Sequence, residues 1–304
     1  MNFRNIIGND GVKELLNNSI STNSVLHSYM FVGPDGIGKK LFAIDFSEMI
    51  LCLNDNKACG NCDSCVKFSG NSHPDFEIVD SEDGKSIKIG QIRLLQEQIA
   101  EKPIVSDKKI YIINNADLMT TEAQNCLLKT LEEPPEYAVI ILILSNETKL
   151  LNTIKSRCTK IHFQKLSNED LIEFAQKNNV EFKQELLNVC DGSISKLLSL
   201  KDNMVSYNML DTILRDLYSK DIVDIWNEAD ILYKSKDNIS SLLDYFNTIF
   251  LKKLRSTNDG RYIIGVKIVE ETKKRLAANA NYDMSIDNLL LKLWEELHEG
   301  NIRS

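Results

Sequence analysis

The residues GPDGIGKK, positions 33 to 40, contain most of what a phosphate-binding loop needs. The P-loop pattern is G-x-x-x-x-G-K followed by Ser or Thr, whose hydroxyl binds Mg²⁺. The loop follows a strand-like run and opens a helix-like one, so backbone N–H groups at the helix N-terminus would converge on phosphate oxygens. The alternative is an ordinary glycine-rich turn between a strand and a helix. We predict a degenerate phosphate cradle formed by Gly33, Pro34, Asp35, Gly36, Ile37, Gly38, Lys39 and Lys40.

Residues that ATP hydrolysis requires are missing at two separate places in the sequence. Lys40 stands where the hydroxyl should be, and an ammonium has no lone pair for a metal ion. It would instead neutralise part of the phosphate charge or point to solvent. The strand that should end in an acidic pair ends YIINNAD, with Asn114 and Asn115 at the acidic positions. We therefore expect weak or no binding of ATP or ADP, and little or no hydrolysis by this chain.

Four cysteines follow the predicted P-loop helix with the spacing C-x6-C-x2-C-x2-C. Four thiolates at such spacing fit a tetrahedral Zn²⁺ ion and leave no open position, so the ion would be structural. A disulfide is the competing interpretation, and it is disfavoured where thiols are kept reduced. His73 is interpreted as a turn residue before Pro74 and not as a fifth ligand. The predicted ligands are Cys52, Cys59, Cys62 and Cys65, and the isolated cysteines are predicted to be buried apolar residues: Cys126, Cys158 and Cys190.

Length and composition describe an ordinary globular protein. The chain has 304 residues, of which 43% are hydrophobic and 26% charged, so two or three domains are expected. No apolar run approaches the ~20 residues of a membrane helix, and the N-terminus lacks an apolar signal region, so we expect a cytoplasmic protein. The formal net charge of −8 argues against tight, independent binding to DNA or RNA.

The first half of the sequence alternates between strand-like and helical stretches. Such alternation predicts a parallel sheet covered by helices on both faces. The predicted strands are 28–33, 76–80, 109–114, 137–145 and 160–163, and the predicted helices are 39–53, 89–102 and 120–133.

The second half has no proline after Pro135 and is permissive for helices. Ser167 followed by Asp170 predicts a helix N-cap, and short helices are expected near 183–190 and 194–200. Amphipathic helices are expected from about residue 206, with Trp226 and Trp294 in their core. The predicted domains are a nucleotide-binding-type domain with a zinc module near 50–70, a three-helix lid and an all-α C-terminal domain: residues 1–164, 165–205 and 206–304.

Four stretches together carry a family resemblance: HSYMFVGPDGIGKK, the four-cysteine insert, ADLMTTEAQNCLLKTLEEPP and IKSRC. With them the chain resembles the bacterial clamp-loader branch of the AAA+ family, over roughly residues 1 to 205 and more weakly over the C-terminal helices. The resemblance implies an AAA+ domain, a helical lid and a helical collar that joins subunits.

Two kinds of subunit in that branch share the zinc module and the SRC motif. The motor subunits, tau and gamma, keep an intact P-loop and an acidic pair, whereas the other kind has eroded versions of both. This chain resembles the second kind, and it also lacks the nucleotide-sensing arginine of the lid, where Gly192-Ser193-Ile194-Ser195 stands. The resemblance implies partners in a hetero-pentameric ring with motor subunits and delta, acting on a sliding clamp and primed DNA. It also implies a part in the DNA polymerase III holoenzyme without polymerase activity of its own.

The resemblance gives Arg157, in the SRC motif, a role on another molecule. In the family this arginine reaches the γ-phosphate of ATP bound by the neighbouring subunit. A guanidinium suits this role because it is always charged and offers paired donors to phosphate oxygens. The alternative is a salt bridge within the chain.

Two other functions remain open from the sequence. The chain would be an autonomous, tau/gamma-like ATPase if Lys40 were tolerated and other groups bound the metal. It would be a free-standing zinc adaptor if the nucleotide fold were vestigial.

Overall fold

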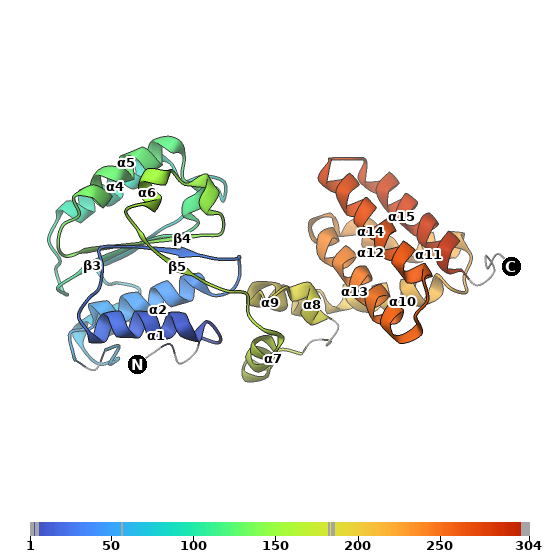
Figure 1. Ribbon diagram of the computed structural model, residues 1–304, viewed down its shortest axis with the longest axis horizontal. Helices are drawn as coiled ribbons and strands as arrows, with labels where there is room; N and C mark the ends of the chain where they lie inside the picture. The colour runs from blue at the N-terminus through green and yellow to red at the C-terminus, as the bar shows by residue number, and fades with distance from the viewer. Residues whose placement is uncertain (1–2, 4–5, 56, 182, 184–185, 299–304) are drawn as a thin grey trace. The chain divides into compact units, whose positions relative to one another are not determined.

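The computed structural model describes residues 3, 6–55, 57–181, 183 and 186–298. The chain packs into two compact units, which we describe separately (Figure 1). The first unit contains residues 1–174 and 193–195, and the second contains residues 175–192 and 196–304. The predicted division at residues 165 and 206 stays a prediction.

The first unit is built on a sheet of five parallel strands in the order β2-β3-β4-β1-β5. β1, β3 and β4 are buried at every position, as expected for parallel strands with helices on both faces. The strands are β1 Ser28–Val32, β2 Phe76–Val79, β3 Lys109–Ile113, β4 Ala138–Leu144 and β5 Thr159–His162. All five were predicted from the sequence.

Helices cover the two faces of this sheet (Figure 1). α1 Asp10–Ser21 and α2 Lys39–Leu51 lie on one face, and α4 Ile89–Ala100, α5 Thr121–Glu132 and α6 Asn152–Lys155 lie on the other. Alternate residues of β4 join different cores: Ile141 packs with Phe42 and Phe46, whereas Ile140 packs with Leu95 and Leu127. The period-two alternation of a strand therefore fixes both helical layers to one sheet.

Shorter elements complete the first unit. The N-cap prediction before α7 is confirmed, since Ser167 N–H donates to Asp170 Oδ2 at 2.9 Å and Asp170 N–H donates to Ser167 Oγ at 3.1 Å. These elements are α3 Asp63–Ser69, η1 Ala116–Leu118, η2 Glu147–Lys149 and most of α7 Asn168–Lys177.

All the elements of the second unit within its described residues are helices. Part of the helix expected near 183–190 falls at 184–185, outside the described residues, while the rest is found as α8. The prediction that Trp226 lies in the core is wrong, because this residue is 36% exposed. Trp294 is half-buried, and its Nε1–H donates to Lys220 O at 2.9 Å. The helices are α8 Leu187–Cys190, α9 Ile194–Asp202, α10 Met204–Asp216, α11 Ile222–Glu228, α12 Asp230–Lys234, η4 Lys236–Asn238, α13 Ile239–Thr257, α14 Arg261–Ala277 and α15 Tyr282–Leu297.

The expected parallel α/β sheet followed by a helical region is thus confirmed, while the zinc insert and the three-helix lid stay predictions. In the described part of the chain, no helix combines the length and the apolar composition needed to cross a bilayer.

Candidate functional site

The predicted phosphate cradle lies between the end of β1 and the start of α2, as its sequence required. Gly36 and Gly38 have φ values of 74° and 96°. Residues with a side chain rarely adopt such backbone angles, so glycine is needed at both positions. Gly33 is needed for space, since a Cβ there would lie 2.6 Å from Phe163 O. Ile37 is 1% exposed and anchors the loop in the core.

Lys39 is turned onto its own loop. Its Nζ donates to the carbonyl oxygens of Gly33 and Pro34 at 2.5 and 2.6 Å and lies 3.7 Å from Asp35 Oδ1. Burial lowers the pKa of Lys39, and the charges of Asp35 and Asp117 partly oppose that shift. A phosphate that recruited this ammonium would have to replace two carbonyl partners.

The middle of the loop, at Gly36, is covered by residues 193–195, which belong to the same unit. Ser195 N–H donates to Gly36 O at 3.2 Å, and a Cβ added to Gly36 would lie 2.2 Å from Ser193 Oγ. Ser195, which stands where the resemblance leads us to expect the lid arginine, therefore contacts the loop.

The side chain of Lys40, which is 46% exposed, extends towards Asp80, the residue after β2. Its Nζ lies 3.7 Å from Asp80 Oδ2. Asn114 donates to the same oxygen at 2.7 Å, and Asn115 donates to Asp80 Oδ1 at 3.4 Å. The two asparagines are therefore hydrogen-bond donors to a carboxylate that the sequence prediction overlooked.

Asp117 is a second acid that the sequence prediction overlooked. Its side chain is 7% exposed, its Oδ2 lies 3.9 Å from Lys149 Nζ, and it accepts from Ser145 Oγ at 3.4 Å. Both overlooked acids follow a strand at the edge where parallel strands end, and this position was the available signal.

The four predicted cysteine ligands come together after α2. Their sulfur atoms all lie within 4.8 Å of one another. The Sγ atoms of Cys52 and Cys62 are 3.9 Å apart and those of Cys59 and Cys65 are 4.0 Å apart, close to the roughly 3.8 Å that a tetrahedron with Zn–S bonds of ~2.3 Å gives. These distances are far too long for disulfides.

Local backbone geometry favours the thiolate of Cys59, whereas burial raises the pKa of Cys65. Cys65 N–H donates to Cys62 Sγ at 3.4 Å, and N–H groups of Asn61 and Cys62 lower the pKa of Cys59 to about 6. A deprotonated sulfur is the form that binds a metal ion, so the donor set fits Zn²⁺. Among the other cysteines, Cys158 and Cys190 are buried as expected, whereas Cys126 is half-buried.

His73 precedes Pro74, as the sequence shows, and it also takes part in a buried network of hydrogen bonds. It is 6% exposed, and its Nδ1 accepts from Asp75 N–H at 3.1 Å. The ring proton is therefore on Nε2, which lies 2.9 Å from Ser64 Oγ. A histidine that donates to a serine is no general base, so this group is structural.

Asp75 extends the same buried network to a loop. Its carboxylate accepts from the N–H groups of Ile104, Val105 and Ser106 at 2.7, 2.7 and 2.9 Å. Ser106 Oγ donates to Leu51 O at 2.7 Å, as does Ser64 Oγ. Because Leu51 precedes Cys52 and Ser64 precedes Cys65, the network holds two predicted metal ligands against the sheet domain.

Arg157 lies where the strands of the sheet begin, whereas the cradle lies where they end. β5 pairs with β1 in parallel, with Tyr29 opposite Thr159 and Val32 opposite His162. Arg157 precedes β5, whereas the cradle follows Val32, so about four residues of strand, roughly 13 Å or more, separate the two. We call the edge where the strands begin the amino edge and the edge where they end the carboxyl edge.

The guanidinium of Arg157 forms the intramolecular salt bridge that the sequence left open. Its Nη2 lies 2.7 Å from Glu132 Oε1, and its Nη1 donates to Thr153 O at 2.9 Å. The side chain is still 34% exposed. Its role towards a neighbouring subunit stays a prediction.

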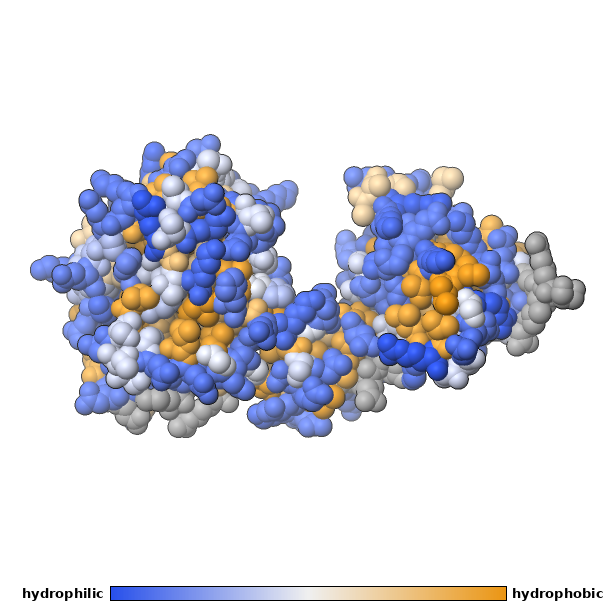
Figure 2. Space-filling view, viewed as in Figure 1, coloured by the Kyte–Doolittle hydropathy of each residue, from blue (hydrophilic) through white to orange (hydrophobic). Residues whose placement is uncertain are grey.

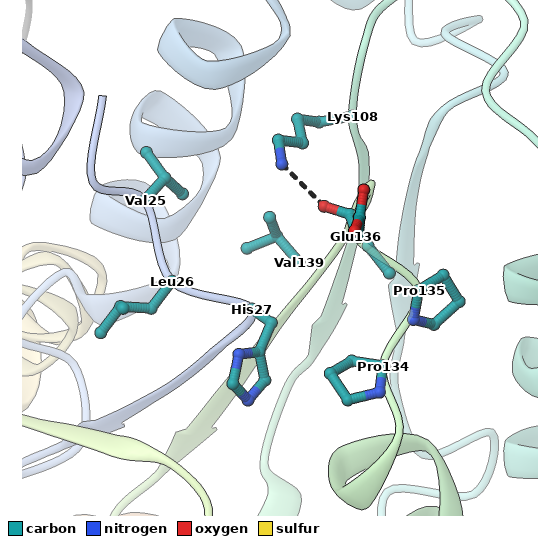
Figure 3. Close-up of a pocket in the computed structure, with 9 residues that line it drawn as sticks. Val25, Leu26, His27, Lys108, Pro134, Pro135, Glu136 and Val139 are labelled. Atoms are coloured by element: carbon teal, nitrogen blue, oxygen red, sulfur yellow. Dashed lines mark hydrogen bonds between the residues drawn. The ribbon is translucent and has the colours of Figure 1, made fainter.

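The amino edge also carries a pocket that the sequence did not predict. Figure 3 shows it between the segment leading into β1 and the turn from α5 to β4. Its volume is about 320 Å³, and Lys108 Nζ donates to Glu136 O at 2.7 Å beside it. With this ammonium engaged by a carbonyl, the pocket shows no catalytic arrangement. Its lining is Val25, Leu26, His27, Lys108, Pro134, Pro135, Glu136, Ala138 and Val139.

Comparison with known proteins agrees with this geometry. The sequence profile of the family described as "DNA polymerase III, delta subunit" matches residues 8–167, more than half of the chain. The chain belongs to this family.

Members of both subunit kinds are similar to the chain. The delta prime subunit of Bacillus subtilis DNA polymerase III is 31% identical over 93% of this chain and 95% of its own length. The gamma/tau subunit of Mycoplasma genitalium is 28% identical over 97% of this chain, which spans only 54% of that relative. A solved gamma-subunit-related protein of Thermotoga maritima is 18% identical, with a TM-score of 0.48 over 92% of this chain and 99% of its own.

The cysteine cluster generates a prediction on metal content. Cys59→Ser is expected to reduce bound zinc well below one ion per chain, because three thiolates no longer close the tetrahedron. Loss of about 2 kcal/mol or more should lower the Tm by at least ~4 °C. Metal analysis and calorimetry measure both. Cys126→Ser is the matched control, and equal zinc in the two variants would contradict the assignment.

The position of Lys40 leads to a prediction about how strongly ATP binding depends on Mg²⁺. In the natural chain Mg²⁺ should change the Kd for ATP less than ~3-fold, since an ammonium already lies beside Asp80. Lys40→Ser removes the ammonium from Asp80 and supplies a hydroxyl near its carboxylate. In this variant Mg²⁺ should change the Kd for ATP more than ~10-fold. Calorimetric titration measures it, with Lys160→Ser as the control lysine. Strong Mg²⁺ dependence in the natural chain would refute the role given to Lys40.

Proposed function

We propose that this chain is a non-hydrolysing delta prime subunit of the DNA polymerase III clamp loader. In this role it supplies Arg157 to ATP held by a neighbouring tau or gamma motor subunit. Together with the motors and delta it would form a hetero-pentameric ring that loads the sliding clamp onto primed DNA during replication. The observation that carries the proposal is the placement of Arg157 and the cradle at opposite edges of one sheet.

The carboxyl edge supports the absence of hydrolysis. Lys39 is bonded to its own loop, and Lys40 offers no lone pair to a metal ion. Asn114 and Asn115 donate to Asp80, so neither activates a water molecule. ATP or ADP would bind weakly or not at all, and the ATP-binding loop is degenerate in function as well as in sequence.

The amino edge supports a role on another molecule. An arginine that lies a strand's length from the cradle is too far to contact a phosphate held there. Its partly exposed guanidinium can approach only a phosphate that arrives from outside the chain. Fingers of this type accelerate hydrolysis by roughly 10³–10⁵ in GTPases, because they stabilise charge that develops in the transition state.

The zinc module would be structural in this function. The four cysteines fit a closed tetrahedral Zn²⁺ site, and the His73–Asp75 network connects them to the sheet domain. A bound ion would supply folding free energy to this insert and would take no part in hydrolysis.

The helical unit would provide the contacts of a collar. Figure 2 shows hydrophobic surface on its visible face, bordered by hydrophilic residues. Apolar area exposed on several helices of one unit is typical of surfaces that other proteins cover. Exposed apolar side chains of this unit include Val205, Met209, Val223, Trp226, Leu251, Ile263, Ile264 and Met284. The net charge of −8 agrees with contact to DNA through the complex and not by this chain alone.

A second candidate, a tau/gamma-like ATPase, has one observation in its favour. Asp80 and Asp117 place two carboxylates near the cradle, and carboxylates are preferred ligands of Mg²⁺. Mg²⁺-dependent turnover by the purified chain, lost on Lys39→Ala, would favour this candidate over the first.

Arg157→Ala tests the proposal in the reconstituted complex. The ring should assemble normally, because the side chain is partly exposed and its ion pair contributes little to stability. Single-turnover hydrolysis at the site that Arg157 serves should fall by about 10³-fold. Rapid-quench measurement with ATP, clamp and primed DNA gives the rate. An unchanged rate would refute the finger role.

A further inference from the structure

The guanidinium of Arg157 is held by two groups at fixed positions. Glu132 Oε1 lies 2.7 Å from Nη2, and Thr153 O accepts from Nη1 at 2.9 Å, with Ser156 Oγ 3.4 Å from the same nitrogen. These contacts come from the end of α5 and from α6 and the residue after it.

The backbone on both sides of this ion pair is anchored. Glu132 is the last residue of α5, directly after Leu131, which is 2% exposed. Arg157 N–H donates to Ile154 O at 3.0 Å, and Arg157 O accepts from Ser28 Oγ at 2.6 Å. Ile154 is fully buried, so the loop cannot shift without disturbing the core.

The contacts leave one side of the guanidinium available. Arginine has five N–H donors in a planar fork. Within the described residues, the contacts of the guanidinium are made by Nη1 and Nη2, and Nε has no partner. The Nε–H donor therefore remains available to a phosphate oxygen, on a group that keeps its full positive charge.

We propose that Glu132 is a positioning residue, which orients Arg157 towards the phosphate of the neighbouring subunit's ATP. The inference rests on the proposed function of Arg157 and deepens it. The pair is too exposed to matter much for folding, since Glu132 is 49% and Arg157 34% exposed. Its contribution is to restrict a long, flexible side chain before the phosphate arrives, which reduces the ordering cost of the contact.

The adjacent glutamate provides a matched control. Glu133 follows Glu132, is exposed, and has no ion pair among the described residues. Glu133→Ala removes the same charge from the same helix end without touching Arg157. Any loss specific to Glu132 is therefore not a general effect of charge at this edge.

The experiment is single-turnover ATP hydrolysis by the complex reconstituted with the full chain, the motor subunits and delta. Glu132→Ala should lower the rate at saturating ATP by roughly 3- to 10-fold, within the rotamer entropy of one arginine, and leave the ATP concentration at half-maximal rate nearly unchanged. Glu132→Gln, which keeps an acceptor oxygen, should recover part of the rate, and Glu133→Ala should match the natural chain. In the Arg157→Ala background, Glu132→Ala should cause no further loss.

The outcomes separate this inference from the proposed function. If Arg157→Ala has no effect, the finger role itself fails. If Arg157→Ala slows hydrolysis but Glu132→Ala does not, or if Glu132→Ala raises the rate, only the positioning role fails. An equal loss from Glu132→Ala with and without Arg157 would also overturn it, because the glutamate would then act by another route.

Discussion

The parallel pairing of β1 with β5 is the constraint on which the functional account depends. In a parallel sheet, residues before the strands and residues after them lie at opposite edges, whatever the loops do. The phosphate cradle follows β1 and Arg157 precedes β5, so one cannot serve the other within a single chain. The same buried residues that form the sheet core therefore decide that any phosphate contact of Arg157 involves a second molecule.

A second theme is the network of fixed charges and hydrogen bonds at the place where an active P-loop enzyme binds its metal ion. In an active P-loop enzyme a divalent cation connects a loop hydroxyl to an acid at the end of a strand. Here the ammonium of Lys40 faces Asp80, and two asparagine amides complete the contact. These contacts connect helix α2 to the strand ends, and Lys40 stands where the P-loop pattern has a metal-binding hydroxyl.

Much of the fold and of the candidate site could be predicted from sequence, because the informative signals are local. β-branched runs predicted the five strands, the glycine pattern predicted the loop between β1 and α2, and cysteine spacing predicted that four cysteines come together. Asp80 was missed because its partners, Lys40 and the pair Asn114–Asn115, come from two other segments that only the fold of the sheet brings beside it. His73 was missed for the same reason: its burial depends on the loop at 104–106, more than thirty residues away. Trp226 was wrongly placed in the core, since size and apolarity do not say which side of a short helix faces inward.

The central claim is that the cradle and the arginine act on different molecules. The most direct test compares Lys39→Ala and Arg157→Ala side by side, in complexes that differ only in this chain, by the rate of single-turnover ATP hydrolysis. The account predicts that the complex with Lys39→Ala hydrolyses ATP at the natural rate and that the complex with Arg157→Ala is strongly slowed. The reverse result, with Lys39 required and Arg157 dispensable, would contradict it.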